Sequence, residues 1–306
     1  MALKDTPAAI VPRRASPVRR HARHAAQGDG ITAVGERPYD RRRLSYANTF
    51  EHPLHRAVIK TIEAATGKLR LLRLIRRFEA MGVPHGQRFW TQALGVMGIE
   101  LDVPPAMLAR IPARGPLVIV ANHPHGLIDG MVLGELMGRV RGDYKILTRS
   151  LLTGVAEIDR FMIPVPFPHE ADALAKSLDM RRRAMAHLAA GGCVVLFPSG
   201  QVATSETAFG PVIEAPWSPF TAKMIRQSGA AVVPILFPGQ NSRAYHIANR
   251  ISPVLRQGLL LHEVVRALGR SQAPRIGRAI APAEIAARQS DPRAFMAWLR
   301  ETTLAL

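Results

Sequence analysis

Residues 117–130 read LVIVANHPHGLIDG and join an apolar run to a polar turn. The run Leu117–Ala121 is continuously hydrophobic, as is typical of strands that are covered on both faces. Asn122–Gly126 follows at once, and Pro124 and Gly126 favour a turn over a helix that has already begun. The stretch therefore predicts a rigid polar loop at the carboxyl end of a buried strand, where α/β proteins usually place functional groups.

Similar apolar runs recur along the chain after Pro105, with helical patterns between them. The further runs are Tyr144–Thr148, Phe161–Val165, Cys193–Phe197 and Ala231–Phe237, and the helical stretches include Ala171–Ala190, Pro219–Gln227 and a closing helix Pro292–Thr303. Buried strands that alternate with helices indicate an α/β domain over residues 105–306, with a sheet covered by helices on both faces. Pro234 inside the last run predicts an edge or bulged strand.

The part before this domain divides into two regions. Residues 1–43 are rich in Ala, Pro, Arg and His and lack periodicity, which predicts a disordered basic arm. An Arg-rich, acid-poor start is also typical of organelle transit peptides. In residues 44–104 a helix is expected from Pro53, with Gly67 as a weak point, and a second helix over Gln87–Met97. The first helix has Lys and Arg between its apolar residues, which suits an anionic membrane surface, although an ordinary helix packed on the core fits equally well.

The composition narrows the class of protein. The 306 residues include 41 Lys and Arg against 23 Asp and Glu, a formal net charge of +18, which favours anionic lipid, nucleic acid or a phosphorylated substrate. A nucleic-acid protein is disfavoured because no fold signature for one is present and only 6% of residues are aromatic. One cysteine, Cys193, excludes an internal disulfide. No apolar run reaches the roughly 18 residues that a transmembrane helix needs.

The polar turn after Ala121 supplies a candidate catalytic pair, His123 and Asp129. A carboxylate beside a histidine fixes its tautomer and raises its basicity, so that the histidine acts as a general base. No Ser or Cys nucleophile motif lies nearby, which favours direct attack by a substrate hydroxyl. Two alternatives stay open: a structural turn in which His123 caps the strand, and a metal site formed by His123, His125 and Asp129. His125 and Asp129 would share one face if a helix had already begun.

Two other strand ends carry turn residues. Phe197-Pro198-Ser199-Gly200-Gln201 follows one run, and the flexibility of Gly200 lets backbone N–H groups approach an oxyanion or an anionic acceptor. Val233-Pro234-Ile235 leads into Phe237–Arg243, where the polar residues from Asn241 either contact a ligand or form a surface loop. By itself each of these segments indicates only a turn.

In order and spacing, the three segments resemble the phospholipid and glycerol acyltransferase family of PlsC-like lysophospholipid acyltransferases. Asn122-His123 to Asp129 is similar to its first block, Phe197–Gly200 to its third and Val233-Pro234-Ile235 to its fourth, while Asp159–Val165 corresponds to the second. The resemblance runs from about Tyr46 to Leu299. It is closest to the hemolysin-labelled branch, which includes relatives of ornithine-lipid O-acyltransferases and carries similar Asn-His-Pro-x-Gly-x-x-Asp-Gly and Gly-x-Asn-Ser-Arg blocks.

The resemblance implies a fold, an activity and a set of site residues. The fold would be glycerol-3-phosphate acyltransferase-like, and the reaction would move a fatty acyl group from acyl-CoA or acyl-ACP to the hydroxyl of a lyso-lipid, with no other cofactor and no metal. His123 and Asp129 would be catalytic. The residues implied in substrate binding are Asn122, Gly126, Phe197, Pro198, Ser199, Gly200 and Pro234. The protein would be cytoplasmic and peripheral on the inner face of the cell membrane. Its partners would be an acyl thioester, a lyso-lipid and an anionic membrane surface, and it would not bind nucleic acid.

The sequence departs from the family pattern in two places. Five residues separate His123 from Asp129, where the family has four, and the third block carries Ser199 instead of Glu and Gln201-Val202 instead of Thr-Arg. The phosphate-facing Arg is therefore missing, which favours a headgroup other than that of lysophosphatidate, such as a lyso-ornithine lipid. Candidates for a replacement cation are Arg160, Lys145 and Arg149. A non-catalytic lipid-binding protein and a thioester hydrolase remain the alternatives.

Overall fold

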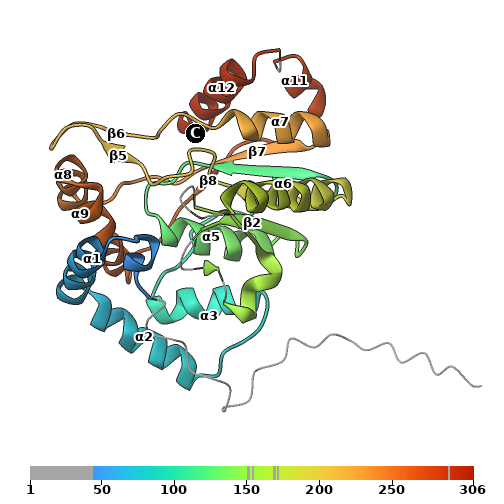
Figure 1. Ribbon diagram of the computed structural model, residues 1–306. Coiled ribbons are helices and arrows are strands. Elements are labelled where there is room, and N and C mark those ends of the chain that lie inside the picture. Colours follow the sequence, from blue (N-terminus) through green and yellow to red (C-terminus); the bar gives the residue numbers. More distant parts are fainter. Residues whose placement is uncertain (1–43, 150–151, 154, 168–169, 171, 289) are drawn as a thin grey trace, which may run out of the picture.

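The structure is a computed structural model that describes residues 44–149, 152–153, 155–167, 170, 172–288 and 290–306 (Figure 1). The expected basic arm, residues 1–43, lies outside the described residues. The main sheet contains β1 (Leu117–Ala121), β2 (Tyr144–Thr148), β3 (Met162–Pro164), β4 (Cys193–Leu196), β7 (Ala231–Leu236) and β8 (Arg275–Ile276). Strands β5 (Thr204–Ser205) and β6 (Val212–Ile213) form a separate hairpin.

The main sheet has the order β3-β2-β4-β1-β7-β8 and is parallel except for β8, which runs antiparallel to β7. All five apolar runs are strands, which confirms the predicted α/β class. Pro234 is expected from the sequence to mark an edge strand or a bulged strand. The edge position is wrong, because β7 pairs with β1 on one side and with β8 on the other. Pro234 lies opposite Val120 in the register, and its carbonyl still accepts a hydrogen bond from the N–H of Gly277.

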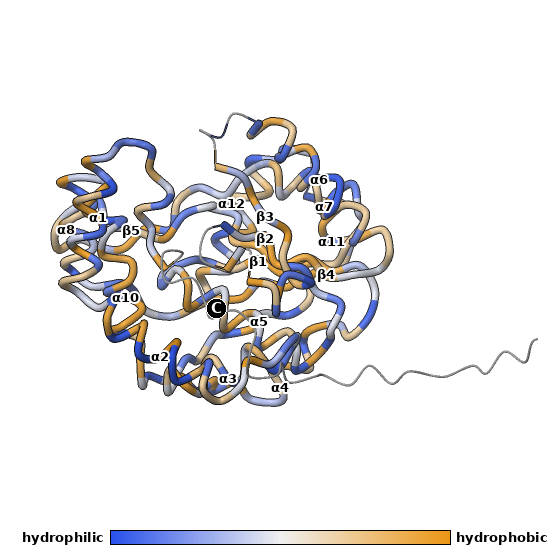
Figure 2. The backbone as a smooth tube through the Cα atoms, turned by 60° about the horizontal axis from the view of Figure 1, so that its bottom comes forward, coloured by the Kyte–Doolittle hydropathy of each residue, from blue (hydrophilic) through white to orange (hydrophobic). Residues whose placement is uncertain are grey.

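Helices cover both faces of this sheet, as predicted. The helical elements are η1 (Tyr46–Thr49), α1 (Pro53–Thr66), α2 (Lys68–Ala80), α3 (Arg88–Met97), α4 (Pro105–Leu108), α5 (Leu127–Gly138), η3 (Ala156–Phe161), α6 (Ala173–Ala189), α7 (Pro219–Ser228), α8 (Arg243–Ile251), α9 (Pro253–Gly258), α10 (Leu260–Ala267), α11 (Pro282–Ala286) and α12 (Pro292–Leu304). Because side chains alternate along a strand, Leu117 and Ile119 join the core under α3, α5 and α10, whereas Val118 and Val120 join the core under α6, α7 and α12. In Figure 2 the segments labelled β1, β2, β3 and β4 are largely orange, that is hydrophobic, and lie in the interior between these helices.

The predicted N-terminal helices pack on the core of the sheet domain. The helix expected from Pro53 is divided into α1 and α2 at Gly67, whose φ of 155° and close approach to Val265 leave no room for a side chain. Ile59, Leu71 and Trp90, one from each of α1, α2 and α3, are buried in the same cluster as the sheet. The hydrophobic core therefore extends across residue 104, the expected boundary between the helical region and the sheet domain. In the described part of the chain, no helix has both the length and the apolar character that crossing a bilayer requires.

Candidate active site

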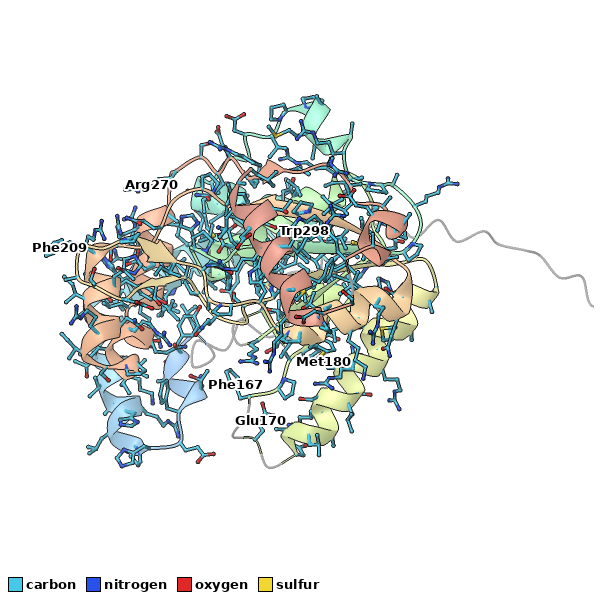
Figure 3. All side chains as sticks on the ribbon, turned by 90° about the horizontal axis from the view of Figure 1, so that it is seen from above. Phe167, Glu170, Met180, Phe209, Arg270 and Trp298 are labelled. Atoms are coloured by element: carbon cyan, nitrogen blue, oxygen red, sulfur yellow. The ribbon has the colours of Figure 1, made fainter. Side chains whose placement is uncertain are left out.

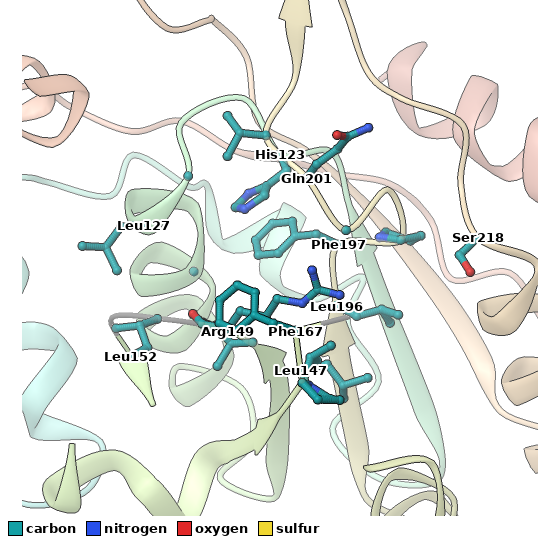
Figure 4. Close-up of a pocket in the computed structure, with 18 of the residues that line it drawn as sticks. His123, Leu127, Leu147, Arg149, Leu152, Phe167, Leu196, Phe197, Gln201 and Ser218 are labelled. Carbon is teal, nitrogen blue, oxygen red and sulfur yellow. Dashed lines mark hydrogen bonds between the residues drawn. The ribbon is translucent and has the colours of Figure 1, made fainter. Parts of the chain in front are cut away.

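The order of the strands brings the predicted site residues together at one edge of the sheet. Strand β1 lies between β4 and β7 and runs parallel to both, so the residues that follow these strands meet at their carboxyl ends. His123, just after β1, stacks on Phe197, just after β4, with 3.8 Å between ring centroids and 18° between ring planes. The first and third sequence blocks are thus joined by direct contact of their aromatic rings (Figure 4).

Asn122 connects β1 to β7. Its Nδ2 donates to the carbonyl of Phe237 at 2.9 Å, and its Oδ1 accepts the N–H of Phe237 at 2.6 Å. The side chain is buried, and both ends of its amide are occupied by the backbone. Asn122 therefore fixes the positions of the two strand ends, and it does not line the cavity described below, contrary to its expected contact with substrate. Pro234 is buried within β7 and is also outside the cavity lining.

The turn that carries the two histidines ends at Gly126, which has a φ of +70° and precedes the first residue of α5. The helix therefore begins at Leu127, after both histidines. Asp129 lies in its first turn and is fully buried. The partial positive charge at a helix N-terminus stabilises a carboxylate in this position. This geometry explains how five intervening residues still allow Asp129 to reach His123.

The carboxylate of Asp129 binds both histidines. Its Oδ2 lies 2.9 Å from Nδ1 of His123 and accepts the N–H of His125 at 2.8 Å, while its Oδ1 lies 3.1 Å from Nδ1 of His125. Burial by itself raises the pKa of Asp129, but the hydrogen bonds from the two histidines outweigh burial and hold that pKa below its usual value. For His125, burial by itself lowers the pKa, and the hydrogen bond and negative charge of Asp129 raise it above the ordinary value.

The surroundings of the two histidines differ, although both bind Asp129. His123 lines a cavity of about 730 Å³ at the carboxyl edge of the sheet, whereas His125 is outside its lining. Nε2 of His125 faces the backbone of Gly239, where an added Cβ would lie only 3.0 Å from that nitrogen. With Nδ1 of His123 held by Asp129, Nε2 of His123 is the ring nitrogen that a molecule in the cavity can reach.

The segment Phe197–Gln201 forms a tight turn beside His123. Gly200 has a φ of +67°, and its N–H donates to the carbonyl of Phe197 at 3.0 Å. That N–H is therefore engaged within the turn, so the expected oxyanion donor is not the amide of Gly200 itself. Phe197, Pro198 and Gly200 line the cavity together with Gly126, in agreement with their expected position. Ser199 is outside the lining, and its hydroxyl donates to the carbonyl of Gln201.

Glu214, between β6 and α7, is a site residue that the sequence analysis missed. It is buried; its Oε2 accepts the backbone N–H of His123 at 3.2 Å, and its Oε1 accepts the indole N–H of Trp217 at 3.2 Å. Burial raises the pKa of Glu214, and the hydrogen bonds from the N–H of His123 and the indole of Trp217 partly offset that rise. A lone Glu outside every recognised block gives no sequence signal, because its partner His123 lies 91 residues earlier in the chain.

The cavity has an apolar wall and several cations. The apolar side chains include Leu127, Leu147, Leu152, Phe167, Leu196 and Leu260 (Figure 4). The cations are Arg149, Arg181 and Arg256. Of the three cations suggested by the sequence, only Arg149 lines the cavity. Arg160 places its guanidinium over the ring of Phe161, and the ammonium of Lys145 donates to the carbonyl of Arg160.

The polar segment after Phe237 has a structural explanation. Ser242 caps α8 by accepting the N–H of Tyr245, and both its N–H and its hydroxyl donate to the carboxylate of Glu263 on α10. Arg243 donates to the carbonyl of Gly210 in the hairpin loop. Neither Asn241 nor Ser242 nor Arg243 lines the cavity, so this segment corresponds to the loop alternative rather than to a ligand contact.

The described residues offer little support for metal or cysteine chemistry. Across the described ranges, no group of three or more His, Cys, Asp or Glu side chains is arranged to hold a metal ion. Cys193 is buried at the start of β4, and burial raises the pKa of its thiol to about 12, which keeps it protonated.

A family comparison identifies the class to which this site belongs. The family model described as Acyltransferase matches residues 89–263, which is more than half of the chain and includes His123, Asp129 and Glu214. The chain belongs to the acyltransferase family. This confirms the family resemblance inferred from the sequence blocks.

Two curated relatives and one solved structure align with parts of this chain. The chain is 29% identical over 145 residues to a lyso-glycine lipid O-acyltransferase of Phocaeicola vulgatus, with 46% of this chain and 49% of that protein aligned. It is equally similar to a lyso-glycine lipid O-acyltransferase of Bacteroides thetaiotaomicron, with 46% and 50% aligned. The chain thus spans about half the length of the curated relatives that it matches. It also aligns with the crystal structure of PlsC, a 1-acyl-sn-glycerophosphate acyltransferase of Thermotoga maritima, at a TM-score of 0.46 and 14% identity, over 71% and 74% of the two chains.

Proposed function

We propose that this protein transfers a fatty acyl group from a thioester, acyl-CoA or acyl-ACP, to the hydroxyl of a lyso-lipid. The observation that carries the proposal is the His123–Asp129 pair at the wall of a cavity with an apolar lining. A fatty acyl chain needs such a lining, and a hydroxyl nucleophile needs a general base with an accessible ring nitrogen. Both requirements are met within one cavity.

The reaction follows from the position of His123. Nε2 takes the proton of the acceptor hydroxyl as its oxygen attacks the thioester carbonyl carbon and forms the new C–O bond. The C–S bond then breaks, and the leaving thiolate receives the proton from the His123 imidazolium. General base catalysis of this kind contributes about 10²–10⁴-fold to the rate. Asp129 fixes the tautomer of His123 and stabilises the imidazolium during the transfer.

Glu214 acts on the same histidine through the backbone. By accepting the N–H of His123, it holds the segment that positions the imidazole over Phe197. We assign Glu214 as a positioning residue in a site whose third block has Ser199 where the family has Glu.

The acceptor is assigned to lyso-lipids with an anionic or zwitterionic headgroup. Both curated relatives are named for lyso-glycine lipid, which has an amino-acid headgroup. Arg149 and Arg256 lie in the cavity lining on different elements, after β2 and on α9. Guanidinium groups bind carboxylate and phosphate oxygens in paired geometry. These cations support a headgroup of that charge and replace the Arg that is missing from the third block.

The protein is assigned to the cytoplasmic surface of the cell membrane as a peripheral protein. A net charge of +18 favours anionic lipid, and each Lys or Arg near such a surface contributes about 1 kcal/mol. Residues 1–43 contain several of these cations, among them Arg13, Arg14, Arg19 and Arg20. Flotation with anionic liposomes should weaken with added salt and after deletion of residues 1–43, and indifference to both changes would contradict the electrostatic attachment.

The test of the activity is transfer of radiolabelled acyl groups by the purified full-length protein to a panel of lyso-lipids. Glycine, ornithine and phosphate headgroups should be compared, with His123→Ala as the control. A labelled product with an added acyl chain, absent with the variant, supports the proposal. Free fatty acid as the only product would indicate a thioester hydrolase, and binding without turnover would indicate a lipid-binding protein; either result overturns the proposed transfer.

A further inference from the structure

One side of the molecule carries exposed apolar side chains on α8, which lines the active-site cavity, and on elements that contact the wall of this cavity. Tyr46 of η1, Tyr245 of α8 and Arg256 of α9 line the cavity. Helix α1 contacts α9 and η1, α9 contacts α8, and α8 contacts β5. In Figures 1 and 2 these elements lie together on one side of the sheet domain. We call this surface, formed by the β5–β6 hairpin, α8 and α1, the hairpin face.

The most exposed apolar residue of this face is Phe209, in the loop between β5 and β6. Its side chain is 79% exposed, and it projects outward from the body of the molecule (Figure 3). A single exposed apolar side chain is common on protein surfaces, whereas several that gather on one face mark a contact with another apolar phase.

Two hydrogen bonds hold the hairpin against α8. The N–H of Ser205 on β5 donates to Nδ1 of His246, which is fully buried in α8. Arg243, at the start of α8, donates to the carbonyl of Gly210 next to Phe209. The hairpin and α8 therefore form one unit that presents Phe209 in a fixed direction.

The helices of the hairpin face carry further exposed apolar side chains. On α8, Ile247 and Ile251 are four residues apart and share one exposed side of the helix, with Ile251 69% exposed. On α1, Leu54 and Val58 have the same spacing, with Leu54 69% exposed. Phe209 thus has apolar neighbours on two helices.

Cations accompany these apolar residues. Arg250 on α8 and Arg56 and Lys60 on α1 are exposed, as is Arg243 beside the hairpin loop. The exposed acids on these elements are Glu51, before α1, and Glu206, in the hairpin. Apolar side chains bordered by an excess of cations match the acyl region and the negative headgroups of an anionic bilayer.

We infer that the hairpin face is the surface by which the protein docks on an anionic lipid bilayer, with Phe209 inserted among the acyl chains. This inference rests on the proposed acyl transfer to a lipid, because it brings the wall of the cavity with Tyr46 and Arg256 against the membrane that holds the acceptor. It extends the expected membrane region, residues 44–104, to a hairpin and a helix more than 100 residues later in the sequence.

The test is binding of full-length variants to sucrose-loaded vesicles of phosphatidylglycerol and phosphatidylcholine. Phe209→Ser and Ile251→Ser should each lower the partition coefficient by roughly tenfold at fixed salt, since burial of a large apolar side chain is worth about that factor or more. Leu174→Ser is the matched control, because Leu174 is 76% exposed and belongs to α6, which lies on the other side of the molecule from the hairpin in Figure 1. Equal binding by Phe209→Ser and wild type, or an equal loss with Leu174→Ser, would overturn the docking surface.

A second measurement does not depend on loss of binding. The fluorescence of Phe209→Trp should be quenched by vesicles with brominated acyl chains, and that of Leu174→Trp should not. Neither measurement needs catalysis, so failure of the docking surface and failure of the proposed reaction are distinguishable. Transfer by Phe209→Ser to a water-soluble short-chain acceptor should retain the wild-type kcat, and a loss of kcat there would indicate damage to the fold or the site rather than to docking.

Discussion

His123 stacks on Phe197, with their ring centroids 3.8 Å apart. The two residues follow neighbouring parallel strands, β1 and β4, so the register of the sheet sets the distance between the rings. Asp129 fixes the imidazole at Nδ1, and Phe197 fixes the plane of the ring. The accessible nitrogen of His123 is therefore oriented before any substrate binds, which reduces the cost of reaching the reactive geometry.

Glu214 completes the support of His123 from the backbone side. In Glu214→Gln, the amide has one acceptor oxygen for two donors, the N–H of His123 and the indole of Trp217. Leaving a buried donor without a partner costs about 1–3 kcal/mol, so we expect kcat to fall by roughly tenfold with little change in KM. Steady-state kinetics with the proposed substrates checks this. Glu301→Gln, an exposed change on α12 outside the hairpin face, is the control, and an equal response of both variants would argue against a specific role of Glu214.

The cations of the cavity should control headgroup recognition. Arg149→Ala and Arg256→Ala remove charge-assisted hydrogen bonds worth about 1.5–3 kcal/mol each, so KM for an anionic lyso-lipid should rise about 10- to 100-fold. The KM for a neutral lyso-lipid should stay unchanged. Arg160→Ala is the matched control, because Arg160 lies outside the cavity lining over the ring of Phe161. A uniform rise for charged and neutral acceptors would contradict a headgroup role.

His125 should make the folding stability depend on pH. Its pKa is raised in the folded protein, so the stability that it contributes is complete below its unfolded pKa of about 6.5 and is lost as pH rises through the folded pKa. The pKa of Asp129 is lowered in the folded protein, so the stability that Asp129 contributes is lost only at acidic pH. Denaturant unfolding of the wild type from pH 6 upward should therefore show a decrease that His125→Gln lacks. The exposed His85→Gln should keep the wild-type decrease.

Two glycines test the packing of the helices under the sheet. Gly134 of α5 lies against the indole of Trp90, and an added Cβ would be 2.6 Å from Cε2 of that buried ring. Gly134→Ala should reduce the free energy of unfolding by about 1–3 kcal/mol through overpacking. Gly95→Ala on α3 meets no atom within 4 Å and should instead add about 0.5–1 kcal/mol from helix propensity. Chemical denaturation of both variants checks the signs, and equal effects would contradict the packing of α3 on α5.

The sequence predicts the parts of this fold that depend on local patterns. The apolar runs delimit β1 and β2 to the residue, and Gly67 marks the division of the first helix. The His123–Asp129 pair is predictable because the two residues are only six positions apart in the sequence. That Asp129 also binds His125 depends on where α5 begins, which Pro124 and Gly126 do not determine from sequence alone.

The remaining features depend on contacts between distant segments. Strand β5 is two residues long and is held by His246 on α8, so no local pattern reveals the hairpin. Glu214 meets His123 only after the sheet has formed. Asn122 resembles a ligand-binding residue in sequence, whereas its amide pairs with the backbone of Phe237, 115 residues away.

The most direct test of the account is to compare His123→Ala and His125→Ala in acyl transfer to a lyso-lipid at saturating substrate. His123→Ala should lower kcat by about 10²–10⁴-fold, because it removes the proposed general base at the cavity. His125→Ala, whose ring faces Gly239 instead of the cavity, should stay within roughly tenfold of the wild type if its fold is confirmed by circular dichroism. Retained transfer by His123→Ala with loss in His125→Ala would contradict the assignment of His123 as the base.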